Sequence, residues 1–412
     1  MTLNFDTENL DEINNSILNG CVPEVSINEN HLAERDEALL AHLETAKLVL
    51  NKLYNLLSKL LSHDADQQIR PEDILNSCLY LCGEHCKSNL PWSDIESYSL
   101  MNLCIEKICS LMNCHSINEL FTKIDVSSIF VGLQYKLKND NWKKYPAAVE
   151  CYMWVLKYLK MPQLNSFLYL VMPLPLNMFD DYCDSSKITA LDAFLHIIDN
   201  TPAVELTMSG YDIVLLKSFE SGLASLEYQL VPYILKCFLM LISKTQMKHL
   251  SKKNIIEWTK FDDVMNILLP RMELEYKNES VECYASILPL ILDFIGFSCI
   301  RWTERLIPLF VKYIMHINST FSTVKAIEAF IKQTWPRKNL DWNVLLTILV
   351  KALYNEDKIN QQPNMENVLA IIECIRILEA ARPECVRNVL NKLKECKEFQ
   401  SKKMFIEFLK TL

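Results

Sequence analysis

Apolar residues recur along most of the chain at steps of three and four positions. Between positions 39 and 61 they are Leu39, Leu40, Leu43, Ala46, Leu50, Leu53, Leu57, Leu60 and Leu61. This spacing places the apolar side chains on one face of an α-helix. Valine and isoleucine follow the same spacing, without the alternation that is typical of half-buried strands. The pattern therefore predicts an all-α protein.

Short polar joints divide this pattern into many separate helices. We predict helices over 93–113, 125–137, 146–160, 162–171, 186–199, 211–220, 225–243, 258–274, 279–296, 298–316, 320–335, 340–354, 364–381, 383–396 and 400–411. From position 186 the helices pair, and the first helices of the pairs start 39, 54, 41 and 44 residues apart. The repeat unit of HEAT and armadillo arrays is about 40–47 residues. The spacing thus predicts a HEAT/armadillo-like α-solenoid of antiparallel helix pairs, with an insertion over 244–254.

Three regions differ in composition. Residues 1–30 are rich in Asn, Asp and Glu, and we expect a loose acidic tail there. Residues 31–137 form a helical region that contains a cluster of cysteines, and residues 138–412 hold the predicted HEAT-like solenoid. We therefore expect one tail followed by two helical regions.

Composition and charge exclude several classes of protein. Only six of the 412 residues are glycine, which is too few for the phosphate-binding loops of most nucleotide enzymes. The net charge is −9, and lysines cluster only in pairs such as Lys143-Lys144, so we expect no direct nucleic-acid partner. The apolar stretch over 167–176 is too short to span a bilayer, so we expect no membrane partner either.

The chain has 15 cysteines, and its first residues lack the pattern of a signal peptide. Free thiols in the reducing cytoplasm or nucleus are the natural interpretation. The cysteine cluster consists of Cys78, Cys82, Cys86, Cys104, Cys109 and Cys114. Its first three members are four residues apart, as on one helix stripe, and no Cys-x-x-Cys motif occurs. We favour a packed core over the two alternatives, a zinc site and a redox switch.

Other candidate chemistry is sparse. His196 and Asp199 lie three residues apart, yet no strained nucleophile accompanies them. The carboxylates Asp180 and Asp181 suit magnesium binding or acid–base work, but their position before a predicted helix favours a structural role. Glu84 is expected on a surface turn. We therefore predict no catalytic residues, no metal, no cofactor and no enzymatic activity.

Trp335-Pro336-Arg337 is a different kind of signal. A predicted helix runs to Trp335, and Pro336 stops it. Tryptophan and arginine are enriched in the hot spots of protein interfaces. Two interpretations stay open, a packed corner between two helices and a contact with a partner protein.

Four groups of residues, taken in their order and spacing, are typical of one family. They are Asn141-Trp142-Lys143 with Pro146, Asp180-Asp181-Tyr182 with Lys187, His196 with Asn200 and Pro202, and Gln333-Thr334-Trp335-Pro336-Arg337. From 141 to 337 the chain thereby resembles the Tel-two-interacting protein two family, the smallest subunit of the Triple T complex. The candidate interface or signature residues are Trp142, Asp180, Asp181, Tyr182, Trp335, Pro336 and Arg337.

The resemblance implies a non-enzymatic α-solenoid scaffold. Its partners would be Tel-two and Tel-two-interacting protein one. The assembly would act with the Hsp-ninety chaperone system on phosphatidylinositol-3-kinase-related kinases, including those of growth control and DNA-damage signalling. Two alternatives remain: an importin- or exportin-like transport adaptor, which would bind a small GTPase or basic cargo, and an all-helical enzyme built on the Cys/His cluster.

Overall fold

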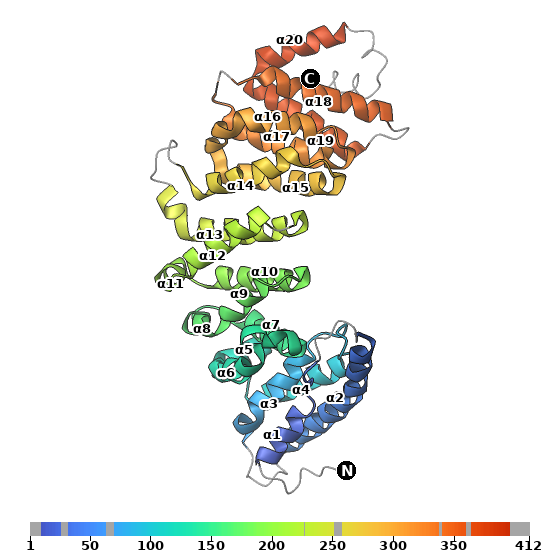
Figure 1. Cartoon of the computed structure of the whole chain (residues 1–412), viewed down its shortest axis with the longest axis vertical. Coiled ribbons are helices and arrows are strands. Elements are labelled where there is room, and N and C mark those ends of the chain that lie inside the picture. Colours follow the sequence, from blue (N-terminus) through green and yellow to red (C-terminus); the bar gives the residue numbers. More distant parts are fainter. Residues whose placement is uncertain are drawn as a thin grey trace. The chain divides into compact units, whose positions relative to one another are not determined.

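The computed structural model describes residues 10–25, 32–62, 70–225, 227–250, 258–337, 340–359 and 364–395. The chain divides into two compact units, Met1–Met208 and Ser209–Leu412 (Figure 1). Every regular element of the described residues is helical, apart from one isolated bridge between Leu90 and Ser93. The prediction of an all-α fold is confirmed.

The first unit is built around one row of stacked helices. Its elements are α1 (Leu10–Leu18), α2 (Leu32–Leu61), α3 (Pro71–Glu84), α4 (Ile95–Leu111), α5 (Ile117–Lys123), α6 (Val126–Leu137), the 3₁₀ helix η2 (Asn139–Lys144), α7 (Pro146–Tyr158), α8 (Gln163–Val171), α9 (Pro173–Phe179), α10 (Asp184–Asn200) and α11 (Ala203–Met208). This row runs α1, α3, α7 and α10, each packed on the next. Helices α2 and α4 pack along each other and against α3, while α6 packs on α7 and α8.

The second unit stacks its helices in two layers. Its elements are α12 (Tyr211–Ser225), η3 (Tyr228–Leu230), α13 (Val231–Leu250), α14 (Lys260–Leu274), α15 (Asn278–Ile295), η4 (Gly296–Trp302), α16 (Thr303–Tyr313), η5 (Ile317–Ser319), α17 (Thr320–Thr334), α18 (Trp342–Ile359), α19 (Met365–Ala381) and α20 (Pro383–Lys394). Helices α15, α17 and α19 stack in one layer, and α14, α16, α18 and α20 stack in the other. Such nearest-neighbour stacking defines an α-solenoid, so the predicted fold class is confirmed within the units.

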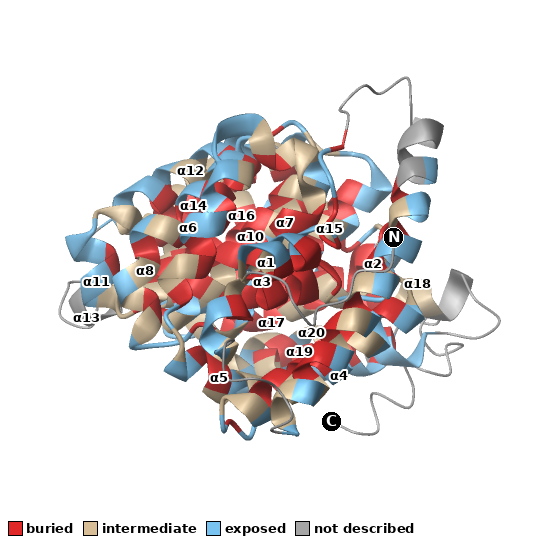
Figure 2. Ribbon diagram, turned by 90° about the horizontal axis from the view of Figure 1, so that it is seen from below, coloured by how far each residue is buried: buried red, intermediate tan, exposed pale blue. Residues whose placement is uncertain are grey.

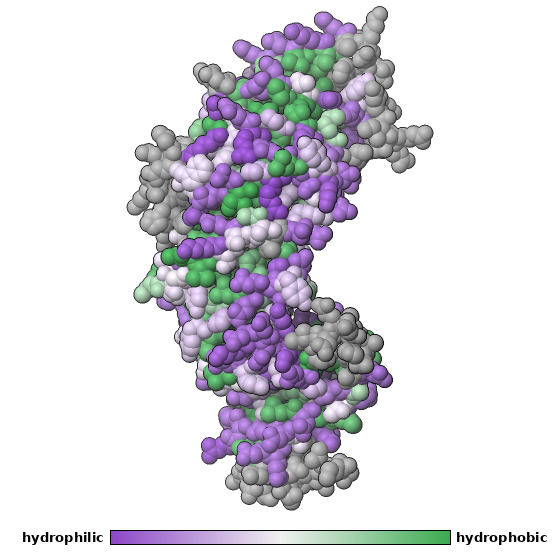
Figure 3. All heavy atoms as spheres, in the orientation of Figure 1, coloured by the Kyte–Doolittle hydropathy of each residue, from purple (hydrophilic) through white to green (hydrophobic). Residues whose placement is uncertain are grey.

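Buried residues line the sides of the helices that face their neighbours, and exposed residues lie on the outside (Figure 2). The segment Asn278–Tyr313 is long and apolar enough to cross a membrane by composition alone. In the structure its first helix, α15, packs against α14 and α17 and buries Tyr284, Leu288 and Ile291. We therefore assign this segment to the core of the second unit. On the face drawn in Figure 3, apolar areas are small and interleaved with polar ones.

The prediction of a loose tail over 1–30 is wrong for residues 10–25. Residues Leu10–Leu18 form α1, which packs on α3 and buries Ile13 and Ile17 completely. Gly20 follows, and a Cβ there would lie 2.9 Å from Val49. Although most residues of this segment are polar, Ile13 and Ile17 form one apolar stripe, which is enough to pack α1 on α3. The proposed boundary at 137/138 falls at the end of α6, inside the first unit, and stays a prediction.

Short helices account for the other differences. The helices α5, α9 and α11 are only seven, seven and six residues long and were not predicted. Pro173 occupies the first turn of α9, where a missing N–H costs nothing. Part of the expected insertion over 244–254 continues α13 to Leu250. The helix predicted over 400–411 lies outside the described residues.

Candidate functional site

The structure brings two of the predicted signature segments together. Trp142 and Lys143 lie on η2, and Asp181 and Tyr182 lie in the turn between α9 and α10. The Nζ atom of Lys143 is 2.8 Å from Oδ1 of Asp181. The same atom lies 5.4 Å from the ring centroid of Trp142 and 5.4 Å from that of Tyr182. One lysine therefore joins a buried carboxylate to two aromatic rings; we call these four residues the Lys143 site.

The Lys143 site presents one aromatic ring to solvent. Trp142 is buried, whereas Tyr182 is 75% exposed. Burial favours the protonated form of Asp181, but the hydrogen bond and charge of Lys143 outweigh it and lower the pKa of Asp181. The same hydrogen bond raises the pKa of Lys143. Both partners are therefore charged at neutral pH, and the exposed Tyr182 ring is held over a fixed ammonium group.

Neighbouring signature residues support this turn. Lys187 donates a 3.3 Å hydrogen bond to the carbonyl oxygen of Tyr182. The Nε2 atom of His196 lies 2.8 Å from the carbonyl oxygen of Leu159, which ties α10 to the end of α7. Asn200 donates a hydrogen bond of 2.9 Å to the carbonyl oxygen of His196. These contacts give Lys187 and His196 structural roles.

Asp180 differs from its neighbour Asp181. Asp180 is exposed at the end of α9, and only Asp181 reaches Lys143. The two carboxylates therefore do not form the paired arrangement that magnesium binding or acid–base work would need. In the part of the chain that the structure describes, no group of three His, Cys, Asp or Glu side chains is placed to hold a metal ion.

Trp335-Pro336-Arg337 forms a corner after α17, and all three residues are exposed. The guanidinium group of Arg382 bonds two carbonyl oxygens of this corner, those of Trp335 and Arg337. Arg337 itself reaches the carbonyl oxygen of Ile300 at 3.4 Å. The backbone is thus a fixed corner while the indole ring of Trp335 points away from the core, 56% exposed. The packed corner describes the backbone of the motif, and the contact with a partner protein stays a prediction.

Five of the six cysteines of the cluster are buried in the first unit, and Cys86 is half-buried. Cys78, Cys82 and Cys104 are buried between α3 and α4, and Cys104 Sγ donates to the carbonyl oxygen of Leu50 at 3.5 Å. Burial raises the pKa of Cys104 to about 12 and that of Cys78 and Cys82 well above the ordinary value. These three thiols are therefore protonated at neutral pH, as expected for packed core residues.

Glu84 is a structural residue whose position was predicted wrongly from the sequence. Its side chain is buried, so the prediction of a surface turn is wrong. The carboxylate accepts a 2.6 Å hydrogen bond from the N–H of Val22 and lies 3.3 Å from Nζ of Lys136. Burial outweighs the attraction of Lys136 and raises the pKa of Glu84. On α3 buried residues recur at helical spacing, at Ser77, Leu81 and Glu84, and this periodicity could have placed Glu84 on the buried side of the helix.

Comparison with known proteins agrees with the family resemblance found in the sequence. The sequence model of the Tti2 family matches residues 130–321, which contain the Lys143 site. TELO2-interacting protein 2 of Homo sapiens is 24% identical over 324 residues, 74% of this chain and 63% of the human protein. The protein of the same name from Rattus norvegicus is 25% identical over 64% of this chain and 54% of its own length. The matches therefore span between about half and two thirds of these relatives.

Similarity to solved structures is much lower. An engineered protein known from a crystal structure aligns over 97% of this chain and 94% of its own length. Its sequence identity is 11% and its TM-score is 0.36. Such a score supports no conclusion about function.

Proposed function

The chain belongs to the Tti2 family, and from this premise we propose that it is a non-enzymatic scaffold subunit of a Triple T complex. Its partners there would be Tel-two and Tel-two-interacting protein one. The match to the family over 130–321 carries the proposal, and the relatives are named as interacting proteins. Stacked helix pairs suit such a role because they offer long faces on which a few anchor residues supply most of the affinity.

The finer role follows from the family resemblance alone. In this proposal the complex acts with the Hsp-ninety chaperone system in the stability, maturation and assembly of phosphatidylinositol-3-kinase-related kinases. The clients include the kinases of growth control and of DNA-damage signalling. The protein would act in the cytoplasm and in the nucleus, without direct contact to nucleic acid or membrane.

Two exposed aromatic residues are the anchors that we propose for the partner contacts. Tyr182 is held by Lys143 in the first unit, and Trp335 is held by its fixed backbone in the second. Large aromatic side chains on rigid supports lose little conformational entropy when they bind. The two anchors would be used independently, each within its own unit.

The test is affinity purification of the tagged chain from its own cells, with mass spectrometry of the recovered proteins. We expect Tel-two and Tel-two-interacting protein one in near-equal amounts, with large kinases in trace. Recovery of neither protein under gentle conditions contradicts the proposal. A small GTPase together with varied basic cargo would support the transport adaptor in its place.

A further inference from the structure

One face of the first unit combines exposed apolar side chains with excess negative charge. It lies on α2 and α4, which pack along each other. The exposed apolar residues are Leu40 and Leu48 on α2, and Ile95 and Leu103 on α4. We call these four residues, with the charged residues Glu44, Lys47, Asp94 and Glu96, the α2–α4 face. The family match does not reach this region, because it begins at residue 130.

The register of α2 against α4 determines where the residues of the α2–α4 face lie along the two helices. Lys47 contacts Glu96 at 3.1 Å, and further along Lys107 lies 5.5 Å from the ring centroid of Tyr54. Contacts that advance together along both helices mean that α2 and α4 run parallel. Leu40 therefore lies about two turns before the charged centre at Lys47, and Leu103 lies about two turns after Glu96. Apolar side chains flank the charged centre over roughly 20 Å, the length of about 14 helical residues.

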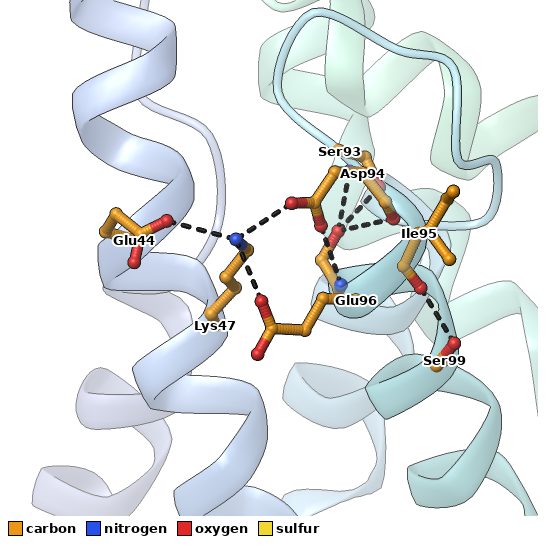
Figure 4. Close-up of polar contacts among 8 residues, drawn as sticks. Glu44, Lys47, Ser93, Asp94, Ile95, Glu96 and Ser99 are labelled. Atoms are coloured by element: carbon orange, nitrogen blue, oxygen red, sulfur yellow. Dashed lines mark hydrogen bonds and ion pairs between the residues drawn. The ribbon is translucent and has the colours of Figure 1, made fainter.

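The charged centre carries more negative than positive charge. Lys47 lies 3.0 Å from Glu44, 2.8 Å from Asp94 and 3.1 Å from Glu96, as Figure 4 shows. One ammonium group among three carboxylates leaves a net charge of −2. The carboxylates of Glu44 and Glu96 are mostly exposed, 74% and 68%, and so are available to a second cation.

We propose that the α2–α4 face docks a basic amphipathic helix of a protein partner. A helix that binds a groove uses apolar anchors at steps of three, four and seven residues, and two turns on either side of the centre match this spacing. Lysine or arginine side chains beside the anchors would reach the exposed carboxylates of Glu44 and Glu96. The same negative charge disfavours an anionic lipid surface. The inference does not depend on the Triple T proposal.

The test uses the full chain and a fluorescein-labelled model peptide, an amidated helix of leucine and lysine at heptad spacing, about 21 residues long. Fluorescence anisotropy should give saturable binding. The double variant Glu44→Gln/Glu96→Gln and the double variant Leu40→Ser/Leu103→Ser should each weaken binding about tenfold, because they remove contacts that only the peptide would use.

Each double variant has a matched control away from the α2–α4 face. Glu304→Gln/Glu366→Gln removes two carboxylates from exposed positions of the second unit. Val131→Ser/Val204→Ser removes two exposed apolar side chains from α6 and α11 of the first unit. Both controls should change binding by less than about twofold, since they make a similar chemical change without touching the proposed contacts.

A second measurement leaves the protein unchanged. A peptide with every lysine replaced by glutamate should bind at least about tenfold more weakly to the wild-type chain. Equal binding of the two peptides would show unspecific apolar adhesion and would overturn the proposal. Absence of saturable binding up to about 100 µM, or equal effects of the face variants and the controls, would overturn it as well.

Discussion

The guanidinium group of Arg382 donates a 2.8 Å hydrogen bond to the carbonyl oxygen of Trp335. A second bond of 2.9 Å reaches the carbonyl oxygen of Arg337, and the same group lies 5.2 Å from the ring centroid of Trp342. The residue that precedes α20 thus fixes the corner that ends α17. Because the bonds go to the backbone, the side chain of Trp335 takes no part in them. Stability and partner binding at this corner can therefore be changed separately.

Arg382→Ala should destabilise the second unit by about 1–2 kcal/mol, since two carbonyl groups lose a charged donor and Trp342 loses a cation. Both hydrogen bonds leave the same atom, Nη2, so Arg382→Lys, whose ammonium group has three donors, should restore part of this stability. Chemical denaturation followed by tryptophan fluorescence measures the effect. Arg387→Ala is the matched control, since its ion pair with Glu379 is exposed and worth little. Equal stability of the Arg382→Ala variant and the wild type would contradict the role of Arg382.

Trp335→Ala should leave the melting temperature unchanged and reduce recovery of the partner proteins, with a loss of about 2 kcal/mol of binding free energy. Arg337→Glu should act in the same direction, because its side chain is exposed. Melting of the purified chain and recovery of the complex are measured separately. Met365→Ala, another exposed apolar position, serves as the control. A parallel fall in melting temperature and recovery would instead favour the packed corner.

Asp181→Asn should lower stability at neutral pH by about 1–2 kcal/mol, because the half-buried Lys143 loses its nearer counter-charge and keeps only the exposed Asp140, 3.7 Å away. The neighbouring Asp180→Asn should have almost no effect, since Asp180 is exposed. The lowered pKa of Asp181 fixes the pH dependence. Its contribution is complete above the ordinary aspartate pKa of about 3.9 and is lost as the pH falls through the lower folded-state value. Melting curves at pH 7 and below pH 4 should show the difference shrinking; a constant difference would be evidence against it.

Glu84 should show the opposite dependence on pH, because its pKa is raised in the folded chain. A carboxyl group that holds its proton more tightly when folded loses stability as the pH rises from about 4.3 toward the folded-state value. Glu84→Gln removes this titration but keeps the shape. The melting temperature of the wild type relative to Glu84→Gln should therefore fall as the pH rises above about 4.3. An unchanged offset across this range would disprove the assignment.

Among the cysteines in the part of the chain that the structure describes, Cys183 should react first with iodoacetamide in the native protein. Its hydrogen bond with Ser185 lowers the pKa of the thiol, whereas burial raises that of Cys82 and Cys104. A thiolate is the reacting species, so the buried pair should be labelled only after unfolding. Mass spectrometry of the labelled peptides gives the order. Cys183→Ser should remove the fast phase, and fast labelling of Cys82 would contradict the packed-core interpretation.

The sequence predicts the long helices well, because their periodic stripes cover several turns. The helix expected over 146–160 is observed as Pro146–Tyr158, and that expected over 364–381 as Met365–Ala381. The seven-residue helix α5 was not predicted, because two turns contain too few apolar positions to establish a period. Periodicity also fails for Glu84, since a carboxylate on an apolar stripe looks like a boundary unless its buried partners are known.

The sequence predicted the residues of the candidate site but not their arrangement in space. Trp142 and Asp181 were chosen as parts of separate segments, and no local pattern joins them. Their meeting depends on how α9 and α10 pack beside η2, through Lys143. At Trp335 the sequence left two interpretations open because the stabilising residue, Arg382, lies at the start of a later helix.

The stacking of α15, α17 and α19 has a consequence for the synthesis of the chain. Helix α15 begins at Asn278 and its main partner α17 at Thr320. A ribosome adds about 5–20 residues per second, so α15 emerges about 2–8 s before the helix that covers it. During this interval the side of α15 that packs against α17 faces solvent, and each further helix of the stack leaves an aggregation-prone intermediate until its partner emerges. Slow codons placed between the two helices would lengthen that exposure and raise the rate of aggregation on the ribosome.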